Sequence, residues 1–222
     1  MTQTTDSDAE YLKKVVQQEA MLWGDEVAVQ YHAAAAASMN KQWTELIFPL
    51  LSKHQIDLSR AVDFACGYGR NALKLRQVGA KHLTLVDVNP DNISYCKKHL
   101  GDLGDIDIVQ NNGLDLSVLP SNGFSHVYSF DAMVHFDLEL VIAYIAEFAR
   151  VLERDGTALI HHSNFSQSPG SDFRSNPHWR NFMSDGLFSH VAQRHNFSIM
   201  EQKIIGWGNV PELDCITVMK RN

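Results

Sequence analysis

The chain has 222 residues, of which 45% are hydrophobic, and a formal net charge of −7. This length suits one α/β domain with a modest addition, and the apolar content is enough for a full hydrophobic core. The acidic balance argues against a protein that holds nucleic acid by its phosphates, because such a protein needs a basic face. A small or neutral substrate fits better.

The cysteines give no sign of a metal cluster. Cys66, Cys96 and Cys215 lie far apart and form no CxxC pair, so neither a zinc cluster nor a disulfide framework is indicated. No charged-then-apolar leader opens the sequence, and no apolar run approaches the ~18 residues of a membrane span. We therefore expect a protein of the reducing cytoplasm without a membrane partner.

The N-terminal part reads as helical. Residues 1–8 are polar and are expected to be disordered. From residue 9 the apolar positions follow helical spacing, and Trp23-Gly24-Asp25 indicates a helix end. Residues 26–51 contain an alanine run and should form one or two further helices that end near Pro49.

The aromatic residues of this part, Tyr31, His32 and Trp43, are expected in buried packing rather than against a ligand. We expect residues 1–57 to be a helical cap of the domain formed by residues 58–222.

Residues 60–87 hold the pattern that organises the chain. A short apolar run breaks into Gly67 and Gly69, a helical stretch follows, and a second apolar run ends at Asp87. Glycines at these places let the backbone take positive φ and approach a ligand, and the helix start offers unpaired N–H groups. An acid about 20 residues past the glycines can accept both hydroxyls of a ribose. The sequence therefore predicts a nucleoside ligand, although residues 67–72 also satisfy the dinucleotide fingerprint.

The remainder alternates between strands and helices. Strands are predicted at residues 106–110, 124–130 and 156–161, and helices at 91–100, at 138–152 with Asp137 as N-cap, and at 179–195. Residues 163–178 form a polar loop of a length typical of disorder or of a functional cover. Strands at 197–205 and 213–219 should pair antiparallel, because their connection is too short for a parallel crossover. The prediction is five parallel strands with a terminal hairpin.

Four motifs carry a resemblance to a known family. They are Val62-Asp63-Phe64-Ala65-Cys66-Gly67-Tyr68-Gly69-Arg70, Val86-Asp87-Val88, Asn112-Gly113-Leu114 and Ser129-Phe130-Asp131-Ala132. With them, residues 58–222 resemble a class I S-adenosylmethionine-dependent methyltransferase. The resemblance implies a Rossmann-like α/β fold with a seven-stranded, mostly parallel sheet. The antiparallel C-terminal hairpin belongs to this family and is lacking in dinucleotide-binding folds.

The resemblance also implies roles toward S-adenosylmethionine as cofactor. Gly67 and Gly69 would lie under its methionine end, Asp63 near its ammonium, Asp87 at the ribose, and Asn112 with the backbone near Gly113 at the adenine. The implied cofactor-binding set is Asp63, Ala65, Gly67, Gly69, Arg70, Asp87, Val88, Asn112, Gly113, Leu114 and Ser129.

The chain departs from the family pattern at three places. Ala65 stands where the family has its first glycine, and Arg70 where it has its last. Asn112 replaces the usual acid, although its amide oxygen can still accept from an adenine amino group. The fourth motif is not the Asn/Asp-Pro-Pro-Tyr typical of enzymes that methylate amino groups of adenine or glutamine, so those substrates are not expected.

Methyl transfer from a sulfonium is an in-line displacement, and the protein mainly has to align the reactants in a dry pocket. A general base is needed only if the acceptor arrives protonated. Among His135, His161 and His162, which follow or end predicted strands, His135 is the candidate base; the alternative is that it simply precedes the helix capped by Asp137. Asp131 could orient His135 or meet the substrate, or it could end its strand by bonding local backbone.

His161 and His162 are adjacent in a strand and should point to opposite faces. We expect one to line the pocket and the other to be exposed. No metal site is predicted, and metal binding by this pair stays open as the less favoured alternative.

The stretch from Phe173 to Phe182 contains aromatic and cationic side chains suited to a planar or anionic small molecule. The alternative is an amphipathic helix with Trp179 and Phe182 in the core and its arginines in water. Trp207 is expected to serve packing.

The sequence thus predicts transfer of a methyl group from S-adenosylmethionine to an oxygen or nitrogen of a small metabolite. Two alternatives remain, an NAD-dependent oxidoreductase that uses the same glycines and a nucleoside-binding module without catalysis. No nucleic-acid or membrane partner is expected. The sequence specifies neither the acceptor nor the oligomeric state.

Overall fold

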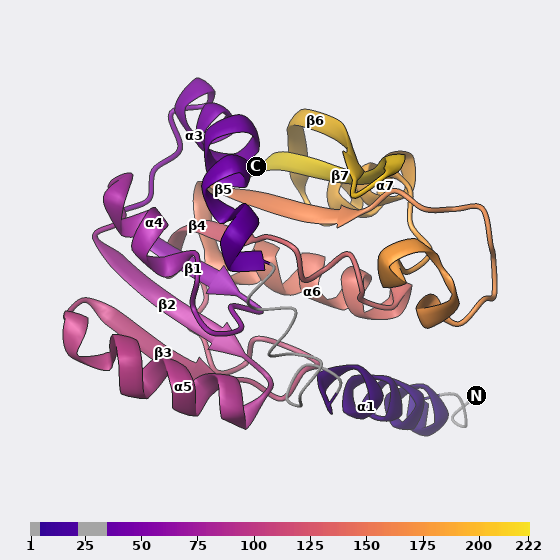
Figure 1. Ribbon diagram of the computed structural model, residues 1–222. Coiled ribbons are helices and arrows are strands. Elements are labelled where there is room, and N and C mark those ends of the chain that lie inside the picture. Colours follow the sequence, from indigo (N-terminus) through magenta and orange to yellow (C-terminus); the bar gives the residue numbers. More distant parts are fainter. Residues whose placement is uncertain (1–4, 22–34) are drawn as a thin grey trace. The chain divides into compact units, whose positions relative to one another are not determined.

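The computed structural model describes residues 5–21 and 35–222 and divides the chain into two compact units, Met1–Val118 and Leu119–Asn222. The strands form a seven-stranded sheet of order β3-β2-β1-β4-β5-β7-β6, in which β7 runs antiparallel to β5 and β6 (Figure 1). The predicted α/β fold with a mostly parallel sheet and an antiparallel terminal hairpin is confirmed.

The first unit contains three parallel strands. They are β1 (Arg60–Phe64), β2 (His82–Asp87) and β3 (Ile106–Gln110). β1 and β2 are buried along almost their whole length, as is usual for parallel strands that are covered on both faces. The central position of these strands explains why their sequences read as near-continuous apolar runs.

Helices of the first unit follow its strands. α4 (Ala72–Gln77) follows β1, and α5 (Pro90–Leu100) follows β2 and continues into the 3-10 turn η2 (Gly101–Leu103). The Asn89 side chain caps α5 by accepting from the Asp91 N–H at 2.8 Å, and Pro90 occupies the first turn, where a missing N–H costs nothing. α5 packs along β2 and β3 (Figure 1).

The N-terminal helices differ in part from the prediction. α1 (Thr5–Met21) begins before residue 9, so the predicted disorder was wrong for residues 5–8, whereas residues 1–4 lie outside the described residues. Residues 35–42 are helical and continue into the π-helix η1 (Trp43–Ile47) and into α3 (Phe48–Lys53). The helix does not end near Pro49, because this proline lies in the first turn of α3.

Trp43 is buried and its indole N–H donates to Asn71 Oδ1 at 2.9 Å, which confirms its predicted packing role. The predicted helix end at Trp23-Gly24-Asp25 and the residues Tyr31 and His32 lie outside the described residues.

The second unit contains the other four strands. They are β4 (Phe124–Ser129), β5 (Leu152–Ser163), β6 (Phe197–Trp207) and β7 (Val210–Arg221). β4 and β5 are parallel, whereas β7 is antiparallel to its two neighbours. Trp207 pairs with Val210, so the hairpin turn is shorter than the predicted loop of residues 206–211 and both strands are longer.

Two helices of the second unit have side-chain caps. Asp137 caps α6 (Leu138–Val151) by accepting from the Glu139 N–H at 3.1 Å, as predicted. Ser184 caps α7 (Asp185–Arg194) by accepting from the Leu187 N–H at 3.1 Å. The prediction that this helix starts at residue 179 was therefore wrong. The chain before Ser184 forms the 3-10 turns η3 (Phe173–Ser175) and η4 (Pro177–Trp179) instead.

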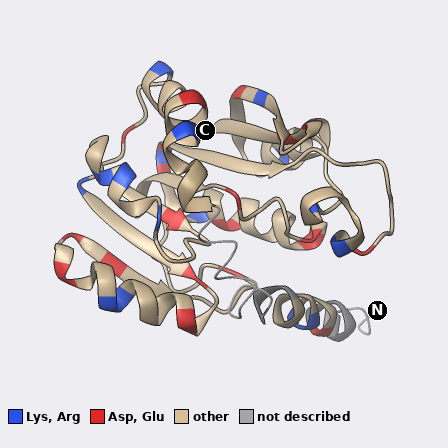
Figure 2. Cartoon of the chain, viewed as in Figure 1, with Lys and Arg blue, Asp and Glu red and all other residues tan. Residues whose placement is uncertain are grey.

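Lysines and arginines are mixed with acids over the described elements, and α5 carries both signs (Figure 2). Within residues 5–21 and 35–222, no helix has the length and apolar character needed to cross a membrane.

Candidate functional site

The glycine loop of the first unit follows β1. Ala65, Gly67 and Gly69 all take positive φ, at 54°, 56° and 67°. The Cys66 N–H donates to Val86 O at 3.0 Å and the Gly69 N–H to Cys66 O at 2.9 Å, which makes the loop a tight turn beside β2. Ala65 holds the left-handed conformation without being glycine, at a cost of about 1–2 kcal/mol. The alanine at this position therefore preserves the backbone path that a glycine would take.

Replacement of Gly69 by alanine should lower the free energy of unfolding by about 2 kcal/mol. The added Cβ would lie 2.5 Å from Leu100 Cδ1, on a residue whose φ already disfavours a side chain. Urea denaturation measures the change. Gly101→Ala is the matched control, because its Cβ would meet nothing within 4 Å and its φ is −61°. Equal stability of the two variants would contradict this explanation.

Asp87 ends β2 and holds the glycine loop. Its Oδ2 accepts from the Gly67 N–H at 2.8 Å, and its Oδ1 accepts from the Asn89 N–H at 2.9 Å and from Asn92 Nδ2 at 3.1 Å. The carboxylate is buried; burial raises its pKa, while these donors act in the opposite direction. The Val88 N–H is a further donor to this carboxylate and also lowers its pKa.

Asp63 lies in β1 just before the loop. It is 2% exposed, and its Oδ2 has no hydrogen-bond partner among the described residues. Burial raises the pKa of Asp63 to about 7, the Arg70 guanidinium lowers it, and Asp87 raises it further. A buried carboxyl oxygen without a donor is costly, and a cationic ligand group would satisfy it. This orphaned atom fits the ammonium of an amino acid moiety.

The third motif, Asn112-Gly113-Leu114, lies beside Val88, the residue that follows Asp87. A Cβ on Gly113 would meet Val88 Cγ2 at 3.0 Å and would clash with Val16 of α1. Gly113 also has φ 79°, so only glycine fits there. Asn112 Oδ1 accepts from the N–H groups of Leu114 and Asp115 at 2.8 and 2.9 Å, and in this way shapes the turn.

Helix α5 contributes loop contacts that the sequence did not reveal. Cys66 Sγ and Cys96 Sγ lie 3.5 and 3.3 Å from the Gly67 carbonyl oxygen, and the ring of Tyr68 stacks on Tyr95 with centroids 4.1 Å apart. The neighbouring Cys96 thiol and burial raise the pKa of Cys66, so this thiol stays protonated. One face of α5 carries Asn92, Tyr95 and Cys96, which are three and four positions apart. This spacing could have predicted that all three contact the glycine loop or Asp87.

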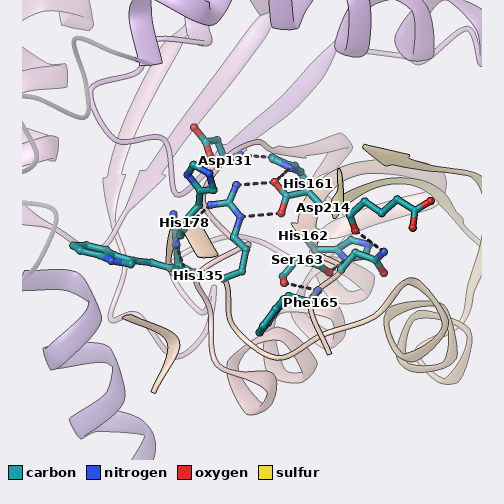
Figure 3. A network of polar contacts seen from close by, with 12 residues as sticks. Asp131, His135, His161, His162, Ser163, Phe165, His178 and Asp214 are labelled. Atoms are coloured by element: carbon teal, nitrogen blue, oxygen red, sulfur yellow. Dashed lines mark hydrogen bonds and ion pairs between the residues drawn. The ribbon is translucent and has the colours of Figure 1, made fainter. Parts of the chain in front are cut away.

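In the second unit, Asp131 follows β4 in a left-handed conformation with φ 61°. Its backbone N–H donates to His161 Nδ1 at 3.1 Å, and His161 Nε2 donates to Asp214 Oδ2 at 3.1 Å (Figure 3). Since Nδ1 accepts, the proton of His161 is on Nε2. His161 thus holds the backbone at Asp131 and has both ring nitrogens engaged.

His162 points to the opposite face of β5, as predicted, but neither histidine is exposed. His162 stacks on Phe188 of α7 at 3.8 Å, and its ring nitrogens contact Ser163 O and Thr217 Oγ1, each at 2.8 Å. Burial lowers its pKa to about 3. The expectation of one exposed histidine was wrong because both faces of β5 are covered. Among the described residues, no group of three potential ligands could hold a metal ion.

His135 precedes α6 and is buried. Its Nδ1 donates to the Trp179 carbonyl oxygen at 2.8 Å. Burial first and then the Arg180 charge lower the pKa of His135 to about 4, against smaller opposing effects of the Trp179 hydrogen bond, Asp131 and Asp214. The imidazole is therefore neutral at physiological pH, with its lone pair on Nε2.

Ser129 ends β4, and its Oγ is buried without a hydrogen-bond partner among the described residues. It lies in the second unit, whereas the rest of the predicted cofactor set lies in the first.

Arg180 and Asp214 form a buried ion pair that the sequence did not reveal. Arg180 is 2% exposed, so the expectation of a solvated arginine fails here, whereas Arg174 is exposed beside Asp172. Trp207 packs on His161 and lies 5.1 Å from the Arg180 guanidinium, which confirms its packing role. No sequence signal links residues 180 and 214, which meet only through folding.

Residues 61–156 match a family model described as a methyltransferase domain. An S-adenosylmethionine-dependent methyltransferase from Mesorhizobium loti is similar in structure, with TM-score 0.61 and 15% identity over 78% of this chain and 96% of that one. One from Methanosarcina mazei has TM-score 0.61 and 16% identity over 77% and 96%. A protein from Pyrococcus horikoshii has TM-score 0.63 and 18% identity over 82% and 91%. No curated protein matches the chain.

The strand order and the glycine loop with its strand-end acid form a Rossmann-like arrangement, and the part of the chain that contains them is similar to a methyltransferase domain. The solved structures show that the chain has the fold of S-adenosylmethionine-dependent methyltransferases.

Proposed function

We propose that the chain methylates an oxygen or nitrogen of a small metabolite. The observation that carries this proposal is the neutral, buried His135, whose proton is held on Nδ1 by Trp179 O at 2.8 Å. Its Nε2 can accept the proton of a methyl acceptor. The mixed surface charges and the net charge of −7 favour a small substrate over a polyanion.

The residues around the glycine loop would hold the cofactor. Asp63 would meet the ammonium, the glycine loop the methionine part, and Asp87 the ribose. Val88, Gly113 and Leu114 would line the adenine. The Asn112 amide oxygen already accepts two N–H groups, so its part would be to shape the turn. When bound, S-adenosylmethionine supplies a methyl group activated by a sulfonium sulfur.

The chain's chemical part would then be alignment and removal of one proton. The acceptor's lone pair forms the bond to the methyl carbon while the carbon–sulfur bond breaks and leaves its electron pair on sulfur. The acceptor's proton passes to Nε2 of His135. Asp131, whose backbone N–H donates to His161 Nδ1, would orient the acceptor. Ser129 Oγ is a further polar group at the end of β4.

We further propose that residues 1–57 are a cap of the methyltransferase domain formed by residues 58–222. Val16 of α1 packs against Gly113, and Trp43 donates to Asn71 directly after the glycine loop. Both contacts connect the N-terminal helices to cofactor motifs. The three free, buried cysteines agree with a reducing cytoplasm as the location.

The affinity for S-adenosylmethionine should fall about 20-fold between pH 7.5 and 5.5. Asp63, with its pKa of about 7, binds a proton over this range, whereas an ammonium partner requires the carboxylate, and protonation therefore competes with binding. Titration calorimetry at both pH values measures the effect. Asp63→Asn should bind more weakly at pH 7.5 and lose most of the pH dependence, whereas the exposed Asp107→Asn should keep it. A pH-independent affinity of the parent protein would contradict the ammonium assignment.

Thermal denaturation with S-adenosylmethionine, S-adenosylhomocysteine or NADH tests the cofactor, because a ligand of the native state raises its stability. We expect a shift with the first two and none with NADH. A shift with NADH alone would favour the oxidoreductase alternative. With the cofactor established, a metabolite screen for S-adenosylhomocysteine release tests the acceptor class, and activity restricted to RNA or protein acceptors would overturn the proposal.

A further inference from the structure

Residues 176–182 are anchored to the terminal hairpin by Arg180. Arg180 Nε donates to Asp214 Oδ1 at 2.8 Å, and Nη2 donates to Asp214 Oδ2 at 2.6 Å. Nη1 donates to the His178 carbonyl oxygen at 2.9 Å, within the same segment. Burial alone would raise the pKa of Asp214, but the hydrogen bonds from His161 and Arg180 hold it below its usual range. Asp214 is therefore a carboxylate that fixes the position of residue 180 (Figure 3).

The same residues are also attached to the segment after β4. The Asn181 N–H donates to Val134 O at 3.0 Å, Asn181 Nδ2 donates to His135 O at 3.3 Å, and Trp179 O accepts from His135 Nδ1 at 2.8 Å. A carbonyl oxygen can only accept. Trp179 O consequently selects the form of His135 that is protonated on Nδ1.

The backbone that presents this carbonyl is strained. His178 and Trp179 both take left-handed conformations, with φ 48° and 57°, and neither is glycine. Such residues cost about 1–3 kcal/mol each and persist only where the surroundings determine them. On the C-terminal side of the turn, the contacts of Arg180 to Asp214 and to His178 O hold residues 178 and 179 in these conformations.

We propose that Arg180, anchored on Asp214, is a positioning residue that presents the Trp179 carbonyl to His135 and thereby keeps the proton of His135 on Nδ1 and its lone pair on Nε2. This inference rests on the proposed function, in which Nε2 receives the acceptor's proton. It also narrows the acceptor class. A neutral imidazole can accept a hydrogen bond from a hydroxyl or an uncharged N–H group that loses its proton during methylation. An ammonium nitrogen has no lone pair until it loses a proton, and an imidazole with a pKa of about 4 is a poor base for that prior step.

The electrostatic surroundings of His135 agree with this arrangement. Arg180 disfavours the imidazolium, while Asp131 and Asp214 favour it, and burial outweighs the two acids. Removing the Arg180 charge together with the Asp214 charge leaves Asp131 as the acid facing His135. The pair thus affects both the tautomer and the protonation of this histidine.

The test is nitrogen NMR of the imidazole of His135, assigned by comparison with His135→Phe. The parent protein should show a neutral ring with its proton on Nδ1. The double variant Arg180→Met, Asp214→Asn removes the ion pair without leaving a buried charge, and the amide oxygen introduced at position 214 could still accept from His161. In this variant we expect the Nδ1–H form to lose its dominance to the Nε2–H or the doubly protonated form.

The matched control is Arg174→Met, Asp172→Asn, because this exposed pair lies in the same part of the chain and contacts neither residue 135 nor residue 179 through any of its hydrogen bonds. The control should keep the parent spectrum. If the double variant fails to fold, Arg180→Lys replaces it, since lysine keeps the charge but cannot form the two-pronged contact.

An unchanged Nδ1–H signal in the folded variant would overturn the positioning role, as would a parent protein protonated on Nε2. The spectrum needs neither cofactor nor acceptor. Absence of a thermal shift with S-adenosylhomocysteine would therefore refute the proposed function without affecting this result.

Discussion

Titration calorimetry of Asp87→Ala is expected to show S-adenosylmethionine binding weakened by about a hundredfold or more. The carboxylate accepts from the Gly67 N–H and, through its other oxygen, from Asn89 and Asn92. Its removal takes away the proposed acceptor for the ribose and also releases the loop that we propose to hold the methionine part. Each hydrogen bond to a charged group contributes about 1.5–3 kcal/mol, so losing the ribose contact alone accounts for much of the effect.

Two further variants separate these contributions. Asn92→Ala removes one internal hydrogen bond to Asp87 but keeps the carboxylate, and it should weaken binding by less than about tenfold. Asp107→Ala is the control, because Asp107 is an exposed acid on the neighbouring strand β3 that pairs with His82. If Asp87→Ala bound the cofactor as tightly as Asp107→Ala, the ribose assignment would be wrong.

The elements that the sequence predicted correctly are those whose determinants lie close together in the chain. β3 has the predicted bounds and β2 has the predicted end at Asp87, because each is a short apolar run limited by turn residues. α6 follows from its periodic apolar face and from Asp137, which caps it two residues before Glu139. The glycine loop likewise depends on contacts between neighbouring motifs, and Asp87 meets Gly67 across only 20 positions.

The segment before α7 could not be predicted because its determinants are distant in sequence. Arg180 meets Asp214 34 positions later, and His135 meets Trp179 44 positions later. Local periodicity instead suggested a helix from residue 179. The exposure of His161 and His162 was misjudged for the same reason, since Trp207 and Phe188, which cover the two faces of β5, come from later elements.

Arg180→Met alone should lower the free energy of unfolding by about 3–5 kcal/mol, because it leaves the Asp214 carboxylate buried without its cation. The double variant with Asp214→Asn should recover a large part of this loss. A buried ion pair contributes little net stability compared with uncharged groups of similar size, because desolvation offsets most of its attraction. The single variant therefore reports the cost of an isolated charge rather than the strength of the pair.

Urea denaturation at pH 7 of the parent, the single variant and the double variant measures these differences. Arg174→Met is the control and should leave the midpoint unchanged, since the pair it breaks is exposed and screened by solvent. A single variant as stable as the parent would mean that Asp214 does not depend on Arg180. A double variant no more stable than the single one would mean that the shape of the arginine, packed under Trp207, matters more than its charge. Residues 176–182 would then be anchored by packing of the Arg180 side chain. In that case Arg180→Lys, which keeps the charge but not the shape, should be less stable than the parent.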